Sequence, residues 1–351
     1  MHPTDSPPAR CLVRALGAAC FVLAACGPDS VTDPPPPSPA FSVLATATLL
    51  TDQLEGGTGS TIGPAGDLYV ADNLAGAIQR VDPRTDEVST YASGFPLPTL
   101  PLGGLMDVAF IGNTAYALTT LVGPDVGGGS IGGIYRVEGP SDFTLIADLA
   151  GYSIANPPPT SFDVPSGVQF AFEPWRGGFL VSDGHHNRVL WVTLDGQVSD
   201  FAQFGNTVPT GLATRGNRLW TAMAGPVPHN PQDGRVVEFG AGAPGTTVAA
   251  GASLLLDVEV GPGNVLYVLA QGPWDGAAPG SPAMPDMGSL HRVMPDGTLA
   301  LRGWVGPADI VPTAARERLR RDARRRGLAR GGRFPAMTDA CGVRTGADAA
   351  C

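Results

Sequence analysis

The sequence predicts an all-β fold, a β-propeller of the six-bladed type in which five blades are recognisable. Among 351 residues, 48 glycines and 35 prolines are dispersed between short apolar runs, and 43% of residues are hydrophobic. This composition is typical of many short strands joined by tight turns. A large apolar residue also returns at separations of 47, 64, 40 and 47 residues, at Tyr69, Tyr116, Leu180, Trp220 and Tyr267. Units of ~40 to 50 residues with about four short strands are the signature of propeller blades.

Each unit has the same internal order of strand, tight turn and strand. Residues 66–88, "GDLYVADNLAGAIQRVDPRTDEV", have counterparts such as "NRLWTAM" with "GRVVEFG", and "NVLYVLAQG" with "GSLHRVMPDGTL". One more short strand precedes each unit: "GSTIG", "MDVAFIG", "SGVQFAF", "TGLATRG" and "LDVEVGP". The longest step contains an insertion at 150–164. A β-sandwich is the alternative architecture, but it does not require the same register five times.

The N-terminus resembles a bacterial lipoprotein signal peptide. Arg10 and Arg14 precede an apolar run that ends in "LAACG", which places Cys26 where the lipid is attached. The run is too short to span a bilayer, and an ordinary secretory signal is the alternative. We therefore expect a signal peptide at 1–25 and a stiff Pro-rich tether at 26–40. The expected location is outside the bacterial cytoplasm, either secreted or held at the membrane by the lipid anchor.

Charge is distributed unevenly along the chain. The net charge is -10, all 22 basic residues are arginine, and ten of them lie between Arg316 and Arg344. Residues 313–351 carry +6, so the remaining 312 residues carry -16. This acidity argues against a nucleic-acid partner, because phosphates require a basic face. Once Cys26 is acylated, only Cys341 and Cys351 remain for a disulfide in the mature chain.

The C-terminal residues do not continue the blade pattern. We place the propeller at 41–302 and an Arg-rich tail at 303–351, which is either disordered or the product of a frameshift. A contact with anionic lipid or polysaccharide is the third alternative. The frameshift is favoured because composition changes abruptly where a sixth blade is expected. The segment "FSVLATATLL" at 41–50 is the unassigned strand-like stretch that would contribute to a sixth blade.

The repeated units resemble the NHL-repeat and SMP-30-like six-bladed propellers. Within that group, residues 41–301 look like the ScyD/ScyE family of the scytonemin cluster, on the motifs "LIADLAGYSIANPP", "VPSGVQF", "VPTGLAT" and "LLDVEVGPGNVLYVL". The resemblance implies a secreted or envelope-associated propeller with no defined molecular activity.

Gluconolactonase-like propellers offer the alternative function, a metal-dependent hydrolase. The resemblance to them implies a glutamate, here Glu55 in "LEGG", an asparagine and an aspartate as ligands of a divalent cation. Ser166 and Thr210 stand at the latter two positions. One carboxylate is too little charge to hold a hard dication. We therefore expect no metal, no cofactor and no catalytic residue, and a binding or interaction module for an unknown envelope or extracellular ligand.

Two groups of polar residues are candidates for a site. His185 and His186 lie in a strand connection between aspartates, and we expect them to be exposed turn residues, with Asp72 and Asp183 bonding backbone amides. The candidate channel mouth consists of Glu55, Thr58, Asp107, Ser166, Thr210 and Asp257. For Asp107 and Asp257, turn capping is favoured over ligand binding.

Overall fold

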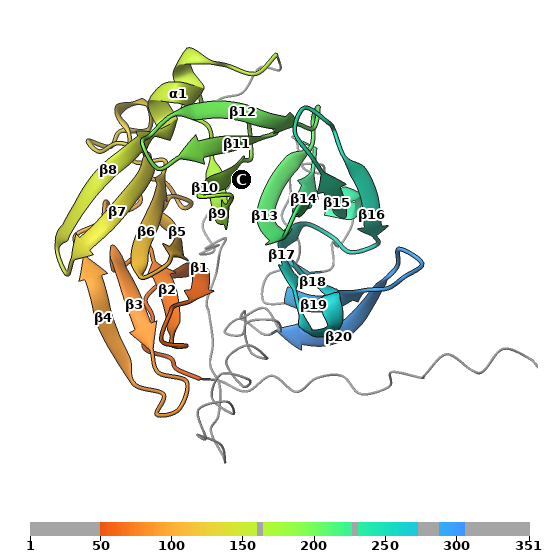
Figure 1. Ribbon diagram of the computed structural model, residues 1–351, viewed down its shortest axis with the longest axis horizontal. Helices are drawn as coiled ribbons and strands as arrows, with labels where there is room; N and C mark the ends of the chain where they lie inside the picture. The colour runs from red at the N-terminus through yellow and green to blue at the C-terminus, as the bar shows by residue number, and fades with distance from the viewer. Residues whose placement is uncertain (1–49, 160–163, 227–230, 273–287, 306–351) are drawn as a thin grey trace, which may run out of the picture. The chain divides into compact units, whose positions relative to one another are not determined.

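The computed structural model describes residues 50–159, 164–226, 231–272 and 288–305. They form five four-stranded antiparallel sheets, each of which follows chain order from its first strand to its fourth (Figure 1). The first strands of successive sheets pack side by side, from β1 through β5, β9 and β13 to β17. The predicted propeller with five recognisable blades is therefore confirmed.

Each blade is a meander of four strands. Blade 1 contains β1 (Gly57–Ile62), β2 (Leu68–Asp72), β3 (Ala77–Val81) and β4 (Val88–Ser93). Blade 2 contains β5 (Gly104–Ile111), β6 (Thr114–Thr120), β7 (Gly133–Gly139) and β8 (Asp142–Asp148). Blade 3 contains β9 (Gln169–Trp175), β10 (Gly178–Asp183), β11 (Arg188–Thr193) and β12 (Val198–Gln203).

The last two blades have the same order. Blade 4 contains β13 (Val208–Arg215), β14 (Arg218–Gly225), β15 (Arg235–Phe239) and β16 (Thr246–Ala250). Blade 5 contains β17 (Leu255–Val260), β18 (Leu266–Ala270), β19 (Gly288–Val293) and β20 (Leu299–Val305). The five repeated apolar residues all fall on the second strand of a blade, as the sequence alignment requires.

Apolar layers between neighbouring blades form the core. Between blades 1 and 2, Tyr69 and Ile78 pack with Leu105 and Val108. Corresponding layers join blade 2 to 3, blade 3 to 4 and blade 4 to 5. Alternation along each strand places one set of side chains against the preceding blade and the other against the following blade, so a blade is stable only between neighbours.

The two faces of the ring differ in the length of their connections. We call "loop face" the face that carries the links from second to third strand and from blade to blade, and "turn face" the opposite one. The loop face holds the 93–104 and 120–133 connections and the helix α1 (Leu149–Ala155) between β8 and β9. The short 3-10 helices η1 (Pro124–Val126) and η2 (Pro231–Asp233) lie there too. The turn face holds mostly tight turns, with the 3-10 helix η3 (Pro262–Asn264) in one of them.

The junction after blade 5 differs from the others. In the described part of the chain, β17 and β1 do not pack closely. The outer face of blade 1 is nevertheless buried: Leu68, Val70 and Val81 form a cluster with Leu50, and Leu54 packs against it. Leu50 is the only residue of the 41–50 segment that the structure describes, so the prediction that this segment contributes to a sixth blade lies largely outside the described residues. No helix within these residues is long and apolar enough to cross a membrane.

Candidate functional site

Two of the predicted channel-mouth residues, Thr58 and Thr210, form hydrogen bonds between neighbouring blades. The hydroxyl of Thr58 on β1 lies 2.8 Å from the carbonyl oxygen of Leu105, at the start of the next inner strand. The hydroxyl of Thr210 on β13 lies 2.9 Å from the carbonyl oxygen of Leu255 in the same relation. Each hydroxyl also lies 3.1 Å from a carbonyl of its own blade. These threonines therefore stabilise the inner ring.

Glu55 and Ser166 lie in different surroundings. Glu55 is exposed on the approach to β1, and its backbone amide donates to Asp72 at 3.0 Å. Ser166 is buried just before β9, and its hydroxyl has no hydrogen-bond partner among the described residues. Ser166 occupies the position in blade 3 that Thr58 and Thr210 occupy in blades 1 and 4, but its hydroxyl does not form the corresponding hydrogen bond to the next blade.

Asp107 and Asp257 lie within inner strands and do not cap turns, so that expectation was wrong. A register irregularity precedes each of them, between Leu105 and Asp107 in β5 and between Leu255 and Asp257 in β17. A Cβ added to Gly59 of β1 would lie 2.2 Å from Asp107 Oδ1, and one added to Gly211 of β13 would lie 2.1 Å from Asp257 Oδ1. Each carboxylate thus packs against a glycine of the preceding inner strand.

Asp107 links three blades. Its Oδ1 accepts a hydrogen bond from the amide of Val108 at 2.8 Å, and its Oδ2 accepts one from the amide of Phe172, on the next inner strand, at 3.1 Å. Burial raises the pKa of Asp107 to about 7, and the charge of Glu259 adds to the rise. The two amides act in the opposite direction, because they favour the charged form.

Two further carboxylates complete this group, and sequence reasoning missed both. Burial raises the pKa of Asp257 well above its ordinary value, with further contributions from Glu259, Asp107 and Glu173. Glu173 on β9 accepts a hydrogen bond from the hydroxyl of Thr214 at 3.0 Å. We call Asp107, Glu173, Asp257 and Glu259 the channel carboxylates. For Glu259 the signal was available in "LLDVEV", where two acids alternate on an apolar inner strand.

These residues do not fit the metal site of a gluconolactonase-like enzyme. Within the described residues, no three His, Cys, Asp or Glu side chains are grouped closely enough to hold a metal ion. At the positions that the family resemblance assigns to ligands, Ser166 is enclosed and Thr210 bonds two carbonyl oxygens. The hydroxyl of Thr210 therefore stabilises the contact between blades 4 and 5.

The paired histidines are not two exposed turn residues, as the sequence had predicted. His185 is partly exposed, whereas His186 is buried. The Nδ1 of His186 lies 3.2 Å from Asp183 Oδ2, and its Nε2 lies 3.2 Å from the carbonyl oxygen of Val164. The prediction failed because His186 belongs to a buried ionic cluster. The buried Arg188 shares this cluster, since its Nε donates to the same Asp183 oxygen at 2.9 Å. Alternation of polar and apolar residues cannot reveal a buried charge that is matched by a partner five residues away.

The Asp183–Arg188 pair holds the insertion before blade 3 in place. One terminal nitrogen of Arg188 donates to the carbonyl oxygen of Asn156 at 2.8 Å and to Asp200 at 3.0 Å. The hydroxyl of Ser153, on α1, donates to Asp183 at 3.1 Å. Burial alone would raise the pKa of Asp183, but the hydrogen bonds and charges of His186 and Arg188 hold it below its ordinary value.

The two aspartates expected to bond backbone amides behave differently. Asp72 accepts hydrogen bonds from the amides of Glu55, Gly56 and Ala75, so its turn-stabilising role is confirmed. Asp183 instead bonds the side chains of Gln169, Ser153 and Arg188, so the same expectation was wrong for it.

Comparison with solved structures finds β-propellers at low sequence identity. A gluconolactonase from Xanthomonas campestris is 12% identical, with 74% of this chain and 80% of that one covered and a TM-score of 0.50. Virginiamycin B lyase from Staphylococcus aureus is 17% identical over 74% and 73%, with a TM-score of 0.41. A PQQ-bound aldose sugar dehydrogenase from Streptomyces coelicolor is 16% identical over 74% and 93%, with a TM-score of 0.45.

No protein-family model matches the sequence, and no curated protein matches it either. At these identities the similarity to solved structures establishes the fold alone. The chain is a β-propeller whose structural neighbours include SMP-30/gluconolactonase-like and virginiamycin B lyase-like propellers.

Proposed function

We propose that this chain is a secreted or envelope-anchored binding module that takes its ligand at the loop face and the mouth of the central channel. The observation that carries the proposal is the concentration of long connections on one face. Loops that gather on one side of a rigid scaffold form a single variable surface, which is the usual place for recognition. Lipid attachment at Cys26 would hold this module at the membrane.

Charge supports a preference for cationic ligands over anionic ones. The channel carboxylates belong to inner strands of blades 2, 3 and 5, and the raised pKa values of Asp107 and Asp257 reflect in part the charge of neighbouring acids. A positively charged ligand group would relieve this repulsion, because opposite charges favour the ionised carboxylates.

A matched pair of ligands tests the proposal. The probes are an N,N,N-trimethylchitosan oligosaccharide, whose quaternary amines stay charged at every pH, and a fully N-acetylated chitosan oligosaccharide, which is neutral and of the same length. We expect the cationic sugar to raise the melting temperature at pH 7.5 more than the neutral one. The Asp257→Asn variant should lose this difference, whereas Asp195→Asn should keep it, because Asp195 is exposed in a turn of the turn face. Equal responses to both sugars would contradict the charge preference.

The alternative, a metal-dependent gluconolactonase-like hydrolase, predicts other results. Calcium or zinc would raise the melting temperature and support hydrolysis of glucono-1,5-lactone, and Glu55→Ala would abolish both effects. Thr210 distinguishes the two functions as well. The Thr210→Val change removes the hydrogen bond to Leu255 and should therefore lower the stability of the propeller. If Thr210 were instead a metal ligand, the Thr210→Val variant would also lose the rise in melting temperature that calcium or zinc produces.

A further inference from the structure

The loop face carries an unusual share of exposed apolar side chains. Among the described residues, six large hydrophobic side chains are at least 40% exposed, and five of them lie on this face: Leu74, Leu97, Leu100, Ile131 and Ile154. We call these five the apolar surface. Singly exposed apolar residues are ordinary, but a group of them on one side marks an interaction site.

Contacts between the loops join the segments that carry the apolar surface over blades 1 to 3. A Cβ added to Gly76 would lie 3.0 Å from Leu97 Cδ2, so Leu97 covers the β2–β3 connection. The hydroxyl of Thr99 donates to the carbonyl oxygen of Leu121 at 3.2 Å, which joins the 93–104 and 120–133 connections. The carbonyl oxygen of Gly132 accepts from the first amides of α1, which brings Ile131 beside the helix that carries Ile154.

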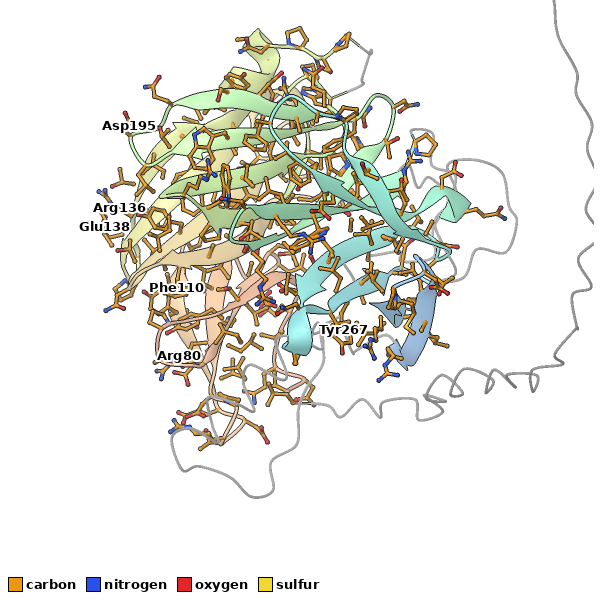
Figure 2. The ribbon with its side chains drawn as sticks, turned by 45° about the vertical axis from the view of Figure 1, so that its right-hand side comes forward. Arg80, Phe110, Arg136, Glu138, Asp195 and Tyr267 are labelled. Carbon is orange, nitrogen blue, oxygen red and sulfur yellow. The ribbon has the colours of Figure 1, made fainter. Side chains whose placement is uncertain are left out.

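The charges around this surface are acidic. Exposed carboxylates on the loop face are Asp52, Glu55, Asp125, Asp148 and Asp233. The exposed arginines of the described residues lie at turns of the turn face or, for Arg136, in the middle of β7. Several are already paired, Arg84 with Asp82, Arg136 with Glu138 and Arg218 with Glu238. Figure 2 shows Arg136 and Glu138 together at the rim. A partner for the loop face should therefore be basic and partly apolar.

The chain itself contains a segment of this chemistry. Residues 313–334, "TAARERLRRDARRRGLARGGRF", contain nine arginines together with Leu319, Leu328 and Phe334. The last described strand, β20, ends at Val305 on the loop face, since Val305 pairs with Gly288 at the start of β19. From Val305 to Arg316 the chain can extend roughly 36 Å at ~3.3 Å per residue. That reach is about twice the ~18 Å radius of gyration of a compact unit of this size.

We propose that residues 313–334 dock on the apolar surface of the loop face of their own propeller. Arginine suits this surface because its aliphatic stem packs on apolar side chains while its guanidinium pairs with carboxylates. Tethering keeps the segment at an effective concentration in the millimolar range, so even weak docking would be largely formed. The inference rests on the proposed function only in that both use the loop face.

Trypsin digestion of the full-length mature chain tests this docking. The chain contains no lysine, so trypsin cuts only after arginine. We expect cleavage within 313–334 to be at least ten-fold slower in the chain than in a synthetic peptide of the same residues. Protection should disappear in 0.5 M NaCl, because salt screens the exposed charges.

Variants locate the docking surface. The Leu97→Ser/Leu100→Ser double change should abolish protection, whereas Leu194→Ser should leave it intact, because Leu194 is as exposed as Leu100 but lies on the turn face. Cleavage of the chain at the rate of the peptide would overturn the proposal, and is the result expected of a solvated tail or a frameshifted end. Protection that survives both salt and the double change would also overturn it. If the double variant misfolds, the salt titration of the wild-type chain decides. If the tail is protected from trypsin but the melting temperature does not respond to the chitosan oligosaccharides, the docking of residues 313–334 stands and the proposed preference for cationic ligands is contradicted.

Discussion

Replacement of Arg188 by methionine should destabilise the propeller more than most single changes. The side chain is almost completely buried and donates to Asp183, Asn156 and Asp200. Methionine fills a similar volume but leaves the carboxylate of Asp183 buried without its guanidinium. It also releases the link that joins the end of α1 to blade 3.

The magnitude follows from the burial of the pair. Removal of one partner of a buried ion pair costs about 3–5 kcal/mol, because the remaining charge is left uncompensated. For a unit of this size, 1 kcal/mol corresponds to ~2–4 °C in melting temperature. The Arg188→Met variant should therefore melt roughly 6–20 °C below the wild type at pH 7.

The pH dependence checks the cause. In the wild type the pKa of Asp183 is lowered, so its stabilisation is present above its unfolded pKa of ~3.9 and is lost as pH falls through the folded pKa. Without Arg188 the pKa of Asp183 loses the lowering by the guanidinium charge and hydrogen bond, while that by His186 remains, so it rises relative to the wild type. The deficit of the variant should therefore shrink at the acidic pH where Asp183 becomes protonated.

Thermal unfolding followed by circular dichroism measures this effect. The control is Arg84→Met, which removes an exposed ion pair with Asp82 and should leave the melting temperature unchanged. The Asp183→Asn/Arg188→Met double variant should recover part of the loss, because the buried charge is gone. A single variant within 2 °C of the wild type would refute the view that this pair holds the insertion against blade 3.

Three further changes test the inner strands and the anchor. Because the pKa of Asp107 is raised to about 7 in the folded state, stability should fall as pH rises from 5 to 8, and Asp107→Asn should flatten the profile measured by chemical denaturation. Gly211→Ala should destabilise by about 1–3 kcal/mol, because the added Cβ would lie 2.5 Å from the Cα of Asp257, whereas Gly240→Ala meets nothing within 4 Å and should be neutral. Cys26→Ser should move the protein from the detergent phase to the aqueous phase in Triton X-114 partitioning, and a mature form that starts after residue 40 without lipid would contradict the anchor.

The repeat was readable from the sequence because blade geometry imposes a strict pattern. Tyr69 and Tyr116 recur at the same place in their units because the second strand of every blade must bury one side chain against each neighbour. The tight turns between strands require glycine where the backbone adopts positive φ, as at Gly66, with φ of 87°, and Gly112, with φ of 60°. Such constraints are local, so composition and spacing were sufficient to predict the architecture.

The polar sites were less predictable because they depend on contacts between distant residues. The sequence predicts only that Asp183 bonds backbone amides in a strand connection. The helical insertion, which supplies Ser153 and Asn156, encloses Asp183 and Arg188 in an ionic network. The position of Asp107 against Gly59 depends on packing between blades 48 residues apart in sequence. No periodicity in a single strand encodes either contact.

Asp107 and Asp257 show how ring closure and the channel are connected. Both follow a register irregularity in an inner strand, and both pack against a glycine of the preceding blade. Asp107 also accepts the amide of Phe172 from the following blade, whereas for Asp257 the described residues supply only the neighbouring amide of Val258. The difference arises because β9 follows β5 directly, while β17 has no closely packed successor among the described strands. Any strand that completes the ring beside β17 can offer Asp257 an amide as β9 does for Asp107, and that bond would lower its pKa because it favours the charged form. The charge of Asp257 thus depends on the strand that packs beside β17.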